Sequence, residues 1–287
     1  MVSMNKLSTH HRAAIISALV EGNSINSTCR MTGAAKNTVL KLLAEIGDAC
    51  WKYQDRTARN LMCPRFQCDE IWSFCHAKAK NVPDEKKGQF GYGDVWTFTA
   101  ICGECKLIPT YLVGNRDSQF AEVFIRDLAA RLLRKVQLTT DGHKMYLEAV
   151  EKTFGARVDY AQLIKLYGQA PEAEQVRYSP GECVGTQKKI ISGKPDDAHI
   201  STSYVERANL TMRMSMRRFT RLTNGFSKKW QNLEAAVSLH FFFYNFARPH
   251  ATLSKPYPKT PAMAAGIADH IWTVEEIVGL LNHGDSN

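Results

Sequence analysis

Three acidic residues are placed where they could bind metal ions. Asp69 lies within a short run of β-forming residues, and Asp141 directly follows the similar run VQLTT. Glu206 is the one acid of an otherwise basic stretch, Ser201–Arg221. Two carboxylates held side by side repel each other unless a cation neutralises them. With a third carboxylate, two Mg²⁺ (or Mn²⁺) ions about 3.5–4 Å apart could clamp the attacking and leaving oxygens of a phosphodiester.

Other acids compete for these roles, since the chain contains 28 aspartate and glutamate residues in all. Glu70 directly follows Asp69 and is one competitor. Asp159 is expected in the middle of a strand, and the pair Asp196 and Asp197 in an irregular segment, so these three rank lower.

The stretch around Glu206 predicts an amphipathic helix with a basic face. At about 100° per residue, Glu206 and Asn209 fall on the same face as Arg213 and Arg217. A plain alternative is a surface ion pair, worth under about 1 kcal/mol. Residues 186–231 carry ten lysines and arginines against three acids, within a net charge of +9 for the chain, which favours a nucleic-acid partner. The side chains expected to contact backbone phosphates are Lys188, Lys189, Arg213, Arg217 and Arg218.

The order of elements in the middle of the chain predicts an α/β fold. The expected strands are 66–75, 95–102, 106–113, 136–140 and 157–166, with helices at 120–133 and 145–154. Three strands, helix, strand, helix and strand is the order of an RNase H-like core, a mixed five-stranded sheet covered by helices. The first and fourth strands are neighbours in such a sheet, which would place Asp69 beside Asp141. The catalytic domain is expected over 63–250, with a long loop insertion at 168–200 and a C-terminal tail with a short helix over 251–287.

Residues 1–50 read as a separate all-α domain that precedes this core, joined to it by a linker at 51–62. Three short helices, with Gly33 in the turn before the third, form the helix-turn-helix pattern. A helical hairpin without nucleic acid is the alternative. In the DNA-binding interpretation, the residues that would face the major groove are Lys36, Asn37, Thr38 and Lys41.

Composition sets the environment of the chain. No apolar run approaches the ~18–20 residues of a membrane span, and a signal-peptide core is lacking, so we expect a cytoplasmic protein whose eight cysteines stay reduced. Cys102 and Cys105 form one CxxC pair, with Cys63, Cys68 and Cys75 upstream. A structural zinc usually takes four ligands from two paired motifs. Only one pair has that spacing, which favours unliganded thiols.

Three segments resemble the DDE transposases of bacterial insertion sequences, most closely the insertion sequence one family. They are CDEIWSFC around Asp69, LTTDGHKMY around Asp141 and YVERANLTMRMSMRRFTRLTNGFSK around Glu206. A fourth, YNFARPHATLSKPYPKTPA, is similar to a segment that follows the catalytic glutamate in many of these enzymes. The resemblance covers roughly 63–262. It implies an RNase H-like fold, Mg²⁺ dependence, nicking at transposon ends and transfer of the freed 3′-OH to target DNA.

The sequence therefore predicts a transposase with Asp69, Asp141 and Glu206 as catalytic metal ligands. It would bind terminal inverted repeats and target DNA, and it is expected to act as a homodimer or larger assembly because two ends must be paired. Two alternatives remain open: an RNase H-like nuclease that cuts without joining, and a helix-turn-helix regulator without catalysis.

Overall fold

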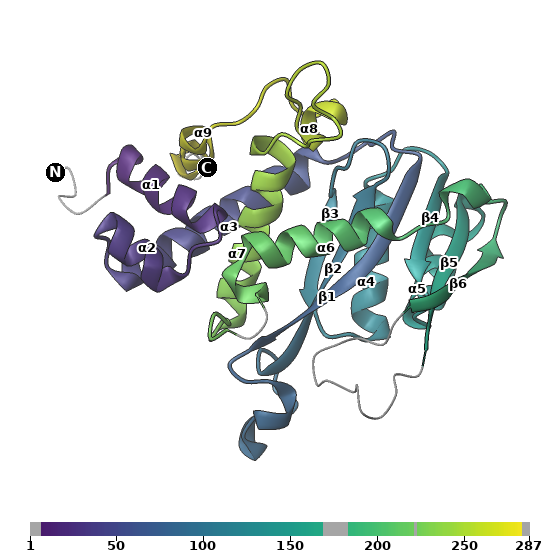
Figure 1. Cartoon of the computed structure of the whole chain (residues 1–287), viewed down its shortest axis with the longest axis horizontal. Coiled ribbons are helices and arrows are strands. Elements are labelled where there is room, and N and C mark those ends of the chain that lie inside the picture. The colour runs from purple at the N-terminus through teal and green to yellow at the C-terminus, as the bar shows by residue number, and fades with distance from the viewer. Residues whose placement is uncertain (1–6, 169–182, 221–222, 283–287) are drawn as a thin grey trace.

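The computed structural model describes residues 7–168, 183–220 and 223–282, and its centre is a mixed six-stranded sheet with helices on both faces (Figure 1). The strands are β1 (Arg65–Cys75), β2 (Gly93–Cys102), β3 (Thr110–Gly114), β4 (Val136–Asp141), β5 (Val158–Tyr167) and β6 (Cys183–Ser192). The helices are α1 (Thr9–Val20), α2 (Ile25–Thr32), α3 (Lys36–Thr57), α4 (Ser118–Ala130), α5 (Met145–Phe154), α6 (Ser203–Ser215), α7 (Trp230–Phe242), α8 (Pro261–Ala264) and α9 (Val274–Gly279).

The strands lie in the order β3-β2-β1-β4-β5-β6. Strand β1 pairs antiparallel with β2 and parallel with β4, so the prediction that the first and fourth strands are neighbours is confirmed. The parallel ladder pairs Cys68 with Thr140. Asp69 and Asp141 are the next residue of each strand, and they therefore lie side by side where β4 ends.

The sheet has one strand more than the five predicted. Strand β6 lies within 168–200, which we predicted to be an irregular loop, and pairs antiparallel with β5 at the edge of the sheet. Seven of its ten residues are exposed and none is buried, so no apolar alternation marks it in the sequence. Residues 169–182 of the predicted loop lie outside the described part of the chain.

Helices cover the two faces of the sheet in separate groups (Figure 1). On one face α4 and α5 pack together, with Phe124 and Tyr146 meeting Phe98 of β2 at ring-centroid distances of 5.6 and 6.5 Å. On the other face α6 crosses β1 and β2 and buries Val205 and Met212. This sandwich fixes α6 over the strand that carries Asp69.

Helix α6 is shorter than the predicted helix Ser201–Arg221. Its first turn is capped from the sheet, because the Gln67 side-chain oxygen accepts hydrogen bonds from the backbone amides of Tyr204 (2.8 Å) and Val205 (3.2 Å). It ends at Ser215, and a separate short turn, Arg217–Phe219, follows.

The N-terminal segment forms three helices, as predicted, with Gly33 before the third. The Ser8 and Ser24 hydroxyls cap α1 and α2, and Gly33 ends α2 with a left-handed φ of 70°. Helix α3 runs on to Thr57, through the first part of the segment 51–62 that we expected as a linker.

The C-terminal half of α3 packs along α7 and joins the helices to the sheet. Gly47 permits this approach, since a Cβ atom there would lie 2.5 Å from the Ala235 Cα. After α7, the tail returns so that α9 packs against α1. Among the described residues, no helix is both long and apolar enough to cross a membrane.

Candidate metal centre

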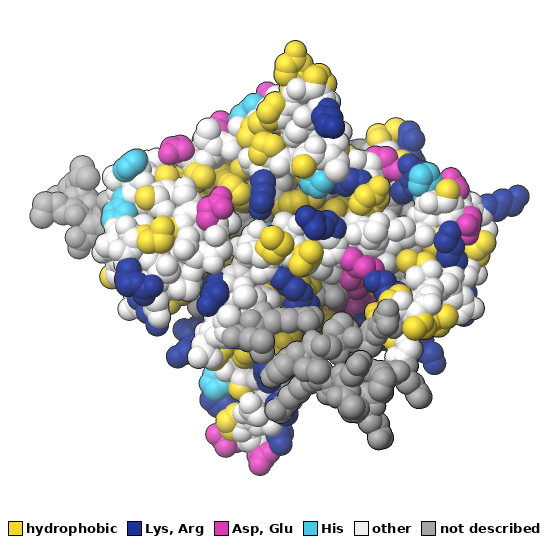
Figure 2. All heavy atoms as spheres, in the orientation of Figure 1, with side chains coloured by type: hydrophobic (Ala, Val, Ile, Leu, Met, Phe, Trp, Pro, Cys, Tyr) yellow, Lys and Arg dark blue, Asp and Glu magenta, His cyan; other side chains and the backbone are white. Residues whose placement is uncertain are grey.

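The centre of the candidate site is a cluster of carboxylates at the junction of β1 and β4. One carboxylate oxygen from each of Asp69, Glu70 and Asp141 lies within 4.8 Å of the others. Figure 2 shows acidic side chains gathered below α6, with lysine and arginine side chains close by. The sequence placed Asp69 and Asp141 together correctly, and the structure adds Glu70 to them.

Asp69 is the member of the cluster that faces α6. The Asn209 side-chain amide donates a hydrogen bond of 2.9 Å to its Oδ2 atom. The pKa of Asp69 is raised to about 6, mainly by burial and in part by the negative charges of Asp141 and Glu206. The charged form of Asp69 is therefore costly until a cation offsets its neighbours.

Glu70 is fully buried, and its carboxylate is held from the opposite face of the sheet. It accepts hydrogen bonds from the Tyr146 hydroxyl and from Arg116, whose Nη2 atom lies 3.0 Å from Oε2. Burial, followed by the charge of Asp141, raises the pKa of Glu70 to about 7, although Tyr146 and Arg116 oppose this rise. Its side chain has 0% exposure, so Glu70 supports the site from beneath and does not face solvent.

Arg116 is a member of the site that the sequence did not reveal. Its guanidinium lies 3.6 Å from Asp141 as well as binding Glu70, and it covers the Trp96 ring at 4.5 Å. It follows β3 in the chain, far in sequence from Glu70 and Asp141, so no local pattern could have identified it. Glu70 was visible only as a competitor, because successive residues of a strand usually point to opposite faces.

Glu206 lies in the first turn of α6 and stands outside the cluster of three carboxylates. Its Oε2 atom forms an ion pair with Lys165 of β5 at 2.6 Å, and the Thr202 hydroxyl donates a hydrogen bond to Oε1. Its charge still contributes to the raised pKa of Asp69. The side chain of Glu206 is 37% exposed, so it remains accessible to a ligand from solvent.

The residues of the cluster fit a hard divalent cation. The donors are carboxylate oxygens, which Mg²⁺ and Mn²⁺ prefer. The Asn209 Oδ1 atom is buried beside them without a hydrogen-bond partner among the described residues. Asp69 and Asp141 are the direct candidates to hold an ion, since Glu70 is already bound to Arg116 and Tyr146.

The competing acids have other partners. Asp159 binds Lys135 at 2.6 Å and the backbone amide of residue 194 at 2.7 Å. Asp196 caps a short turn, and Asp197 pairs with Lys188 at 2.7 Å. None of these three acids belongs to the carboxylate cluster of Asp69, Glu70 and Asp141.

The residues predicted to bind DNA fall into separate groups. Lys36, Asn37 and Lys41 are exposed at the start of α3, and Thr38 is partly exposed. Lys41 also pairs loosely with Glu45, at 3.8 Å. The four side chains share the exposed N-terminal end of one helix.

The other predicted DNA contacts lie on β6, on α6 and in the short turn after α6. Lys188 and Lys189 are exposed on the edge strand β6, and Arg217 is exposed beyond α6. Arg213 is half-buried. Arg218 is directed inward, where its Nε atom donates to the Ser227 hydroxyl at 2.8 Å and burial lowers its pKa to about 10.

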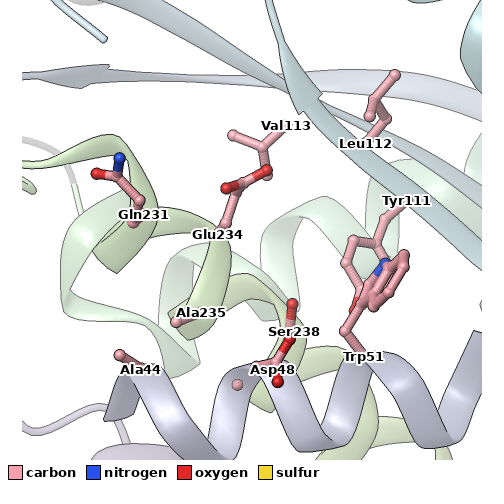
Figure 3. Close-up of a pocket in the computed structure, with 11 residues that line it drawn as sticks. Ala44, Asp48, Trp51, Tyr111, Leu112, Val113, Gln231, Glu234, Ala235 and Ser238 are labelled. Carbon is pink, nitrogen blue, oxygen red and sulfur yellow. The ribbon is translucent and has the colours of Figure 1, made fainter. Parts of the chain in front are cut away.

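A separate apolar hollow of about 320 Å³ lies between α3, α7 and β3 (Figure 3). Trp51, Tyr111 and Glu234 are among its lining residues, and none of the clustered acids reaches it. Burial raises the pKa of Glu234 there. The hollow is thus distinct from the candidate metal centre.

Searches of protein families and of curated proteins find no match for this chain. Among solved structures, a piggyBac transposase synaptic complex with hairpin DNA aligns with a TM-score of 0.41 and 8% identity, over 98% of this chain and 73% of that chain. The Mos1 strand transfer complex aligns with a TM-score of 0.23 and 12% identity, over 56% of this chain and 60% of that chain. A pre-cleavage Mos1 transpososome aligns with a TM-score of 0.29 and 8% identity, over 100% of this chain and 82% of that chain. TM-scores this low assign no role to any residue of this chain.

Proposed function

We propose that this chain is a metal-dependent DNA transposase of the DDE type, as its sequence motifs suggest. The observation that carries the proposal is the placement of Asp69 and Asp141 as neighbours on the parallel strands β1 and β4. Helix α6, which bears Glu206, is tied to the same point by the bond between Asn209 and Asp69. The strand order of the sheet, apart from the added β6, is that expected of an RNase H-like core.

In this proposal, Asp69, Asp141 and Glu206 hold two Mg²⁺ ions, and Glu70 keeps its structural bonds. The ions would supply activation of water or a DNA 3′-OH and stabilisation of charge on the phosphodiester. Lys165 is the present partner of Glu206, and the bound cation would replace Lys165 at that carboxylate. Arg116 neutralises Glu70 and part of the charge of Asp141, which lets acids crowd together before an ion binds.

DNA would contact two surfaces of the protein. The exposed start of α3, with Lys36, Asn37 and Lys41, is proposed to recognise the terminal inverted repeats in the manner of a helix-turn-helix. Arg217 and Lys189 are exposed and are proposed to contact phosphates near the scissile bond. Binding should therefore weaken steeply with salt. Pairing of two ends would require at least two copies of the chain.

The decisive experiment incubates the purified protein with DNA carrying the ends of its own element, in Mg²⁺ or in EDTA, and sequences the products. We expect Mg²⁺-dependent nicks at the terminus and joining of the 3′-OH ends to new DNA. Glu206→Gln should abolish nicking and keep DNA binding. Glu275→Gln, a change at an exposed position on α9, should alter neither nicking nor DNA binding. Nicks without joining would instead identify a nuclease. Binding without any strand break would identify a regulator, and either result would overturn the proposal.

A further inference from the structure

The fold brings together three cysteines that lie apart in the sequence. Cys102 ends β2, Cys105 lies in the turn after it, and Cys63 precedes β1. One sulfur atom from each lies within 4.8 Å of the others, and all three side chains are buried. The sequence showed only the CxxC pair, and the pairing of β1 with β2 supplies the third thiol.

The spacing of the sulfur atoms suits a metal ion. The Cys63 and Cys105 sulfurs are 3.5 Å apart. In a tetrahedral zinc site with Zn–S bonds of about 2.3 Å, neighbouring sulfurs lie roughly 3.8 Å apart. A disulfide would require about 2.0 Å. Cys50, Cys68 and Cys75 are equally buried but join no group of this kind among the described residues, so burial alone does not gather thiols in this protein.

The backbone around the cluster is fixed by hydrogen bonds. The Cys102 amide donates to the Leu107 carbonyl at 2.9 Å, and its carbonyl accepts from the Lys106 amide at 3.1 Å. The Gly103 amide donates to the Arg65 carbonyl at 3.0 Å, which ties the turn to the start of β1. Ligands on such a turn need little rearrangement to close around an ion.

The Glu104 carboxylate lies close enough to the Cys102 thiol to supply a fourth ligand. The Oε2 atom of Glu104 lies 3.4 Å from the Cys102 sulfur, while its other oxygen binds Arg65. This distance is close to the roughly 3.5 Å expected between a sulfur and an oxygen bound to the same tetrahedral zinc.

We propose that Cys63, Cys102 and Cys105 bind one structural Zn²⁺ ion, with Glu104 or a water molecule in the fourth position. The site is independent of the proposed catalytic activity. It braces the start of α6, because the Lys106 amine covers the Tyr204 ring at 3.3 Å. Zinc would therefore stabilise the turn against which the Glu206 helix begins.

The test measures metal content and cobalt spectra of the reduced full-length chain. We expect one zinc per chain, and replacement by Co²⁺ should give thiolate-to-cobalt charge-transfer bands together with strong visible bands of a tetrahedral site. Carboxylates cannot produce the charge-transfer bands, so the signal should persist in Asp69→Asn. Removal of zinc by a chelator should lower the thermal unfolding midpoint.

Cys63→Ala and Cys105→Ala should lose the zinc and the bands, whereas the matched buried variant Cys50→Ala should keep both. Glu104→Gln separates the two fourth ligands, since it should change the visible bands only if Glu104 binds the metal. Absence of zinc and of thiolate–cobalt bands in the reduced wild-type chain would overturn the proposal, even if the variants fail to fold. A Cys63–Cys105 disulfide found by peptide mapping of the freshly purified protein would also overturn it.

Discussion

The Asn209 side chain donates a 2.9 Å hydrogen bond to Asp69, and this bond connects helix α6 to the central strand β1. It opposes the rise in the pKa of Asp69 that burial causes. The same contact therefore positions the helix that carries Glu206 and favours the charged form of the acid beneath it.

Asn209→Ala should weaken binding of Mg²⁺ or Mn²⁺, because the pKa of Asp69 would rise above about 6. Loss of a hydrogen bond to a charged group costs about 1.5–3 kcal/mol, or roughly 10- to 100-fold in affinity. Titration calorimetry at pH 6.5 and pH 8 measures the affinity for the metal ion, and the loss of affinity should be smaller at pH 8. The exposed variant Asn26→Ala serves as a control. Equal affinities for Asn209→Ala and the wild type at both pH values would contradict the assigned role.

Lys165→Met should tighten metal binding if Glu206 is a ligand, since the ion would no longer displace the lysine from the carboxylate. The ion pair is partly exposed, so the gain should not exceed about fivefold. The same calorimetric titration measures the metal affinity of this variant, with the exposed Lys152→Met as the matched control. Weaker binding in Lys165→Met would argue that Lys165 supports the site rather than blocks it.

The stability of the metal-free protein should fall as the pH rises from about 4 to about 7. The pKa of Asp69 is raised from 3.8 to about 6 in the folded chain, so the folded state binds more protons than the unfolded state across this range. The shift corresponds to about 3 kcal/mol for Asp69 alone. Glu70, with a pKa raised to about 7, acts in the same direction.

Urea unfolding in EDTA at several pH values measures this fall. Asp69→Asn should flatten the dependence of the free energy of unfolding on pH. From pH 4 to pH 8 the variant should therefore lose less stability than the wild type. Mg²⁺ should restore stability to the wild type at pH 8 but not to the variant. A wild-type stability that rises with pH, at the same slope as the variant, would exclude the raised pKa.

Arg131→Met should destabilise the chain by about 3–5 kcal/mol, as expected when one partner of a buried ion pair is removed. The guanidinium is nearly inaccessible and binds Asp127 of α4 at 2.9 Å and Asp55 of α3 at 2.7 Å. It thereby joins the N-terminal helices to the core. Arg126→Met, exposed on the same helix α4, should change stability by less than about 1 kcal/mol in the same urea titrations. Similar losses in both variants would deny Arg131 this joining role.

The sequence by itself determined the local elements and the residues with metal chemistry. Hydrophobic periodicity located β1 and β4, and the position of each acid along its strand then placed Asp69 beside Asp141, because parallel neighbours share a register. The same periodicity failed for β6, which is an exposed edge strand whose side chains leave no apolar alternation. It also extended α6 too far, since the helix ends at Ser215 while helix-forming residues continue.

Only the tertiary structure decided which residues outside the predicted strand pairs meet. Arg116 reaches Glu70 and Asp141 from beyond β3, and Cys63 reaches Cys105 across the β1–β2 pairing. Helix α3 runs beyond the boundary expected from composition, because its second half finds a packing partner in α7. Such contacts depend on the distance between side chains in space, and the sequence pattern of a loop or turn carries no information about that distance.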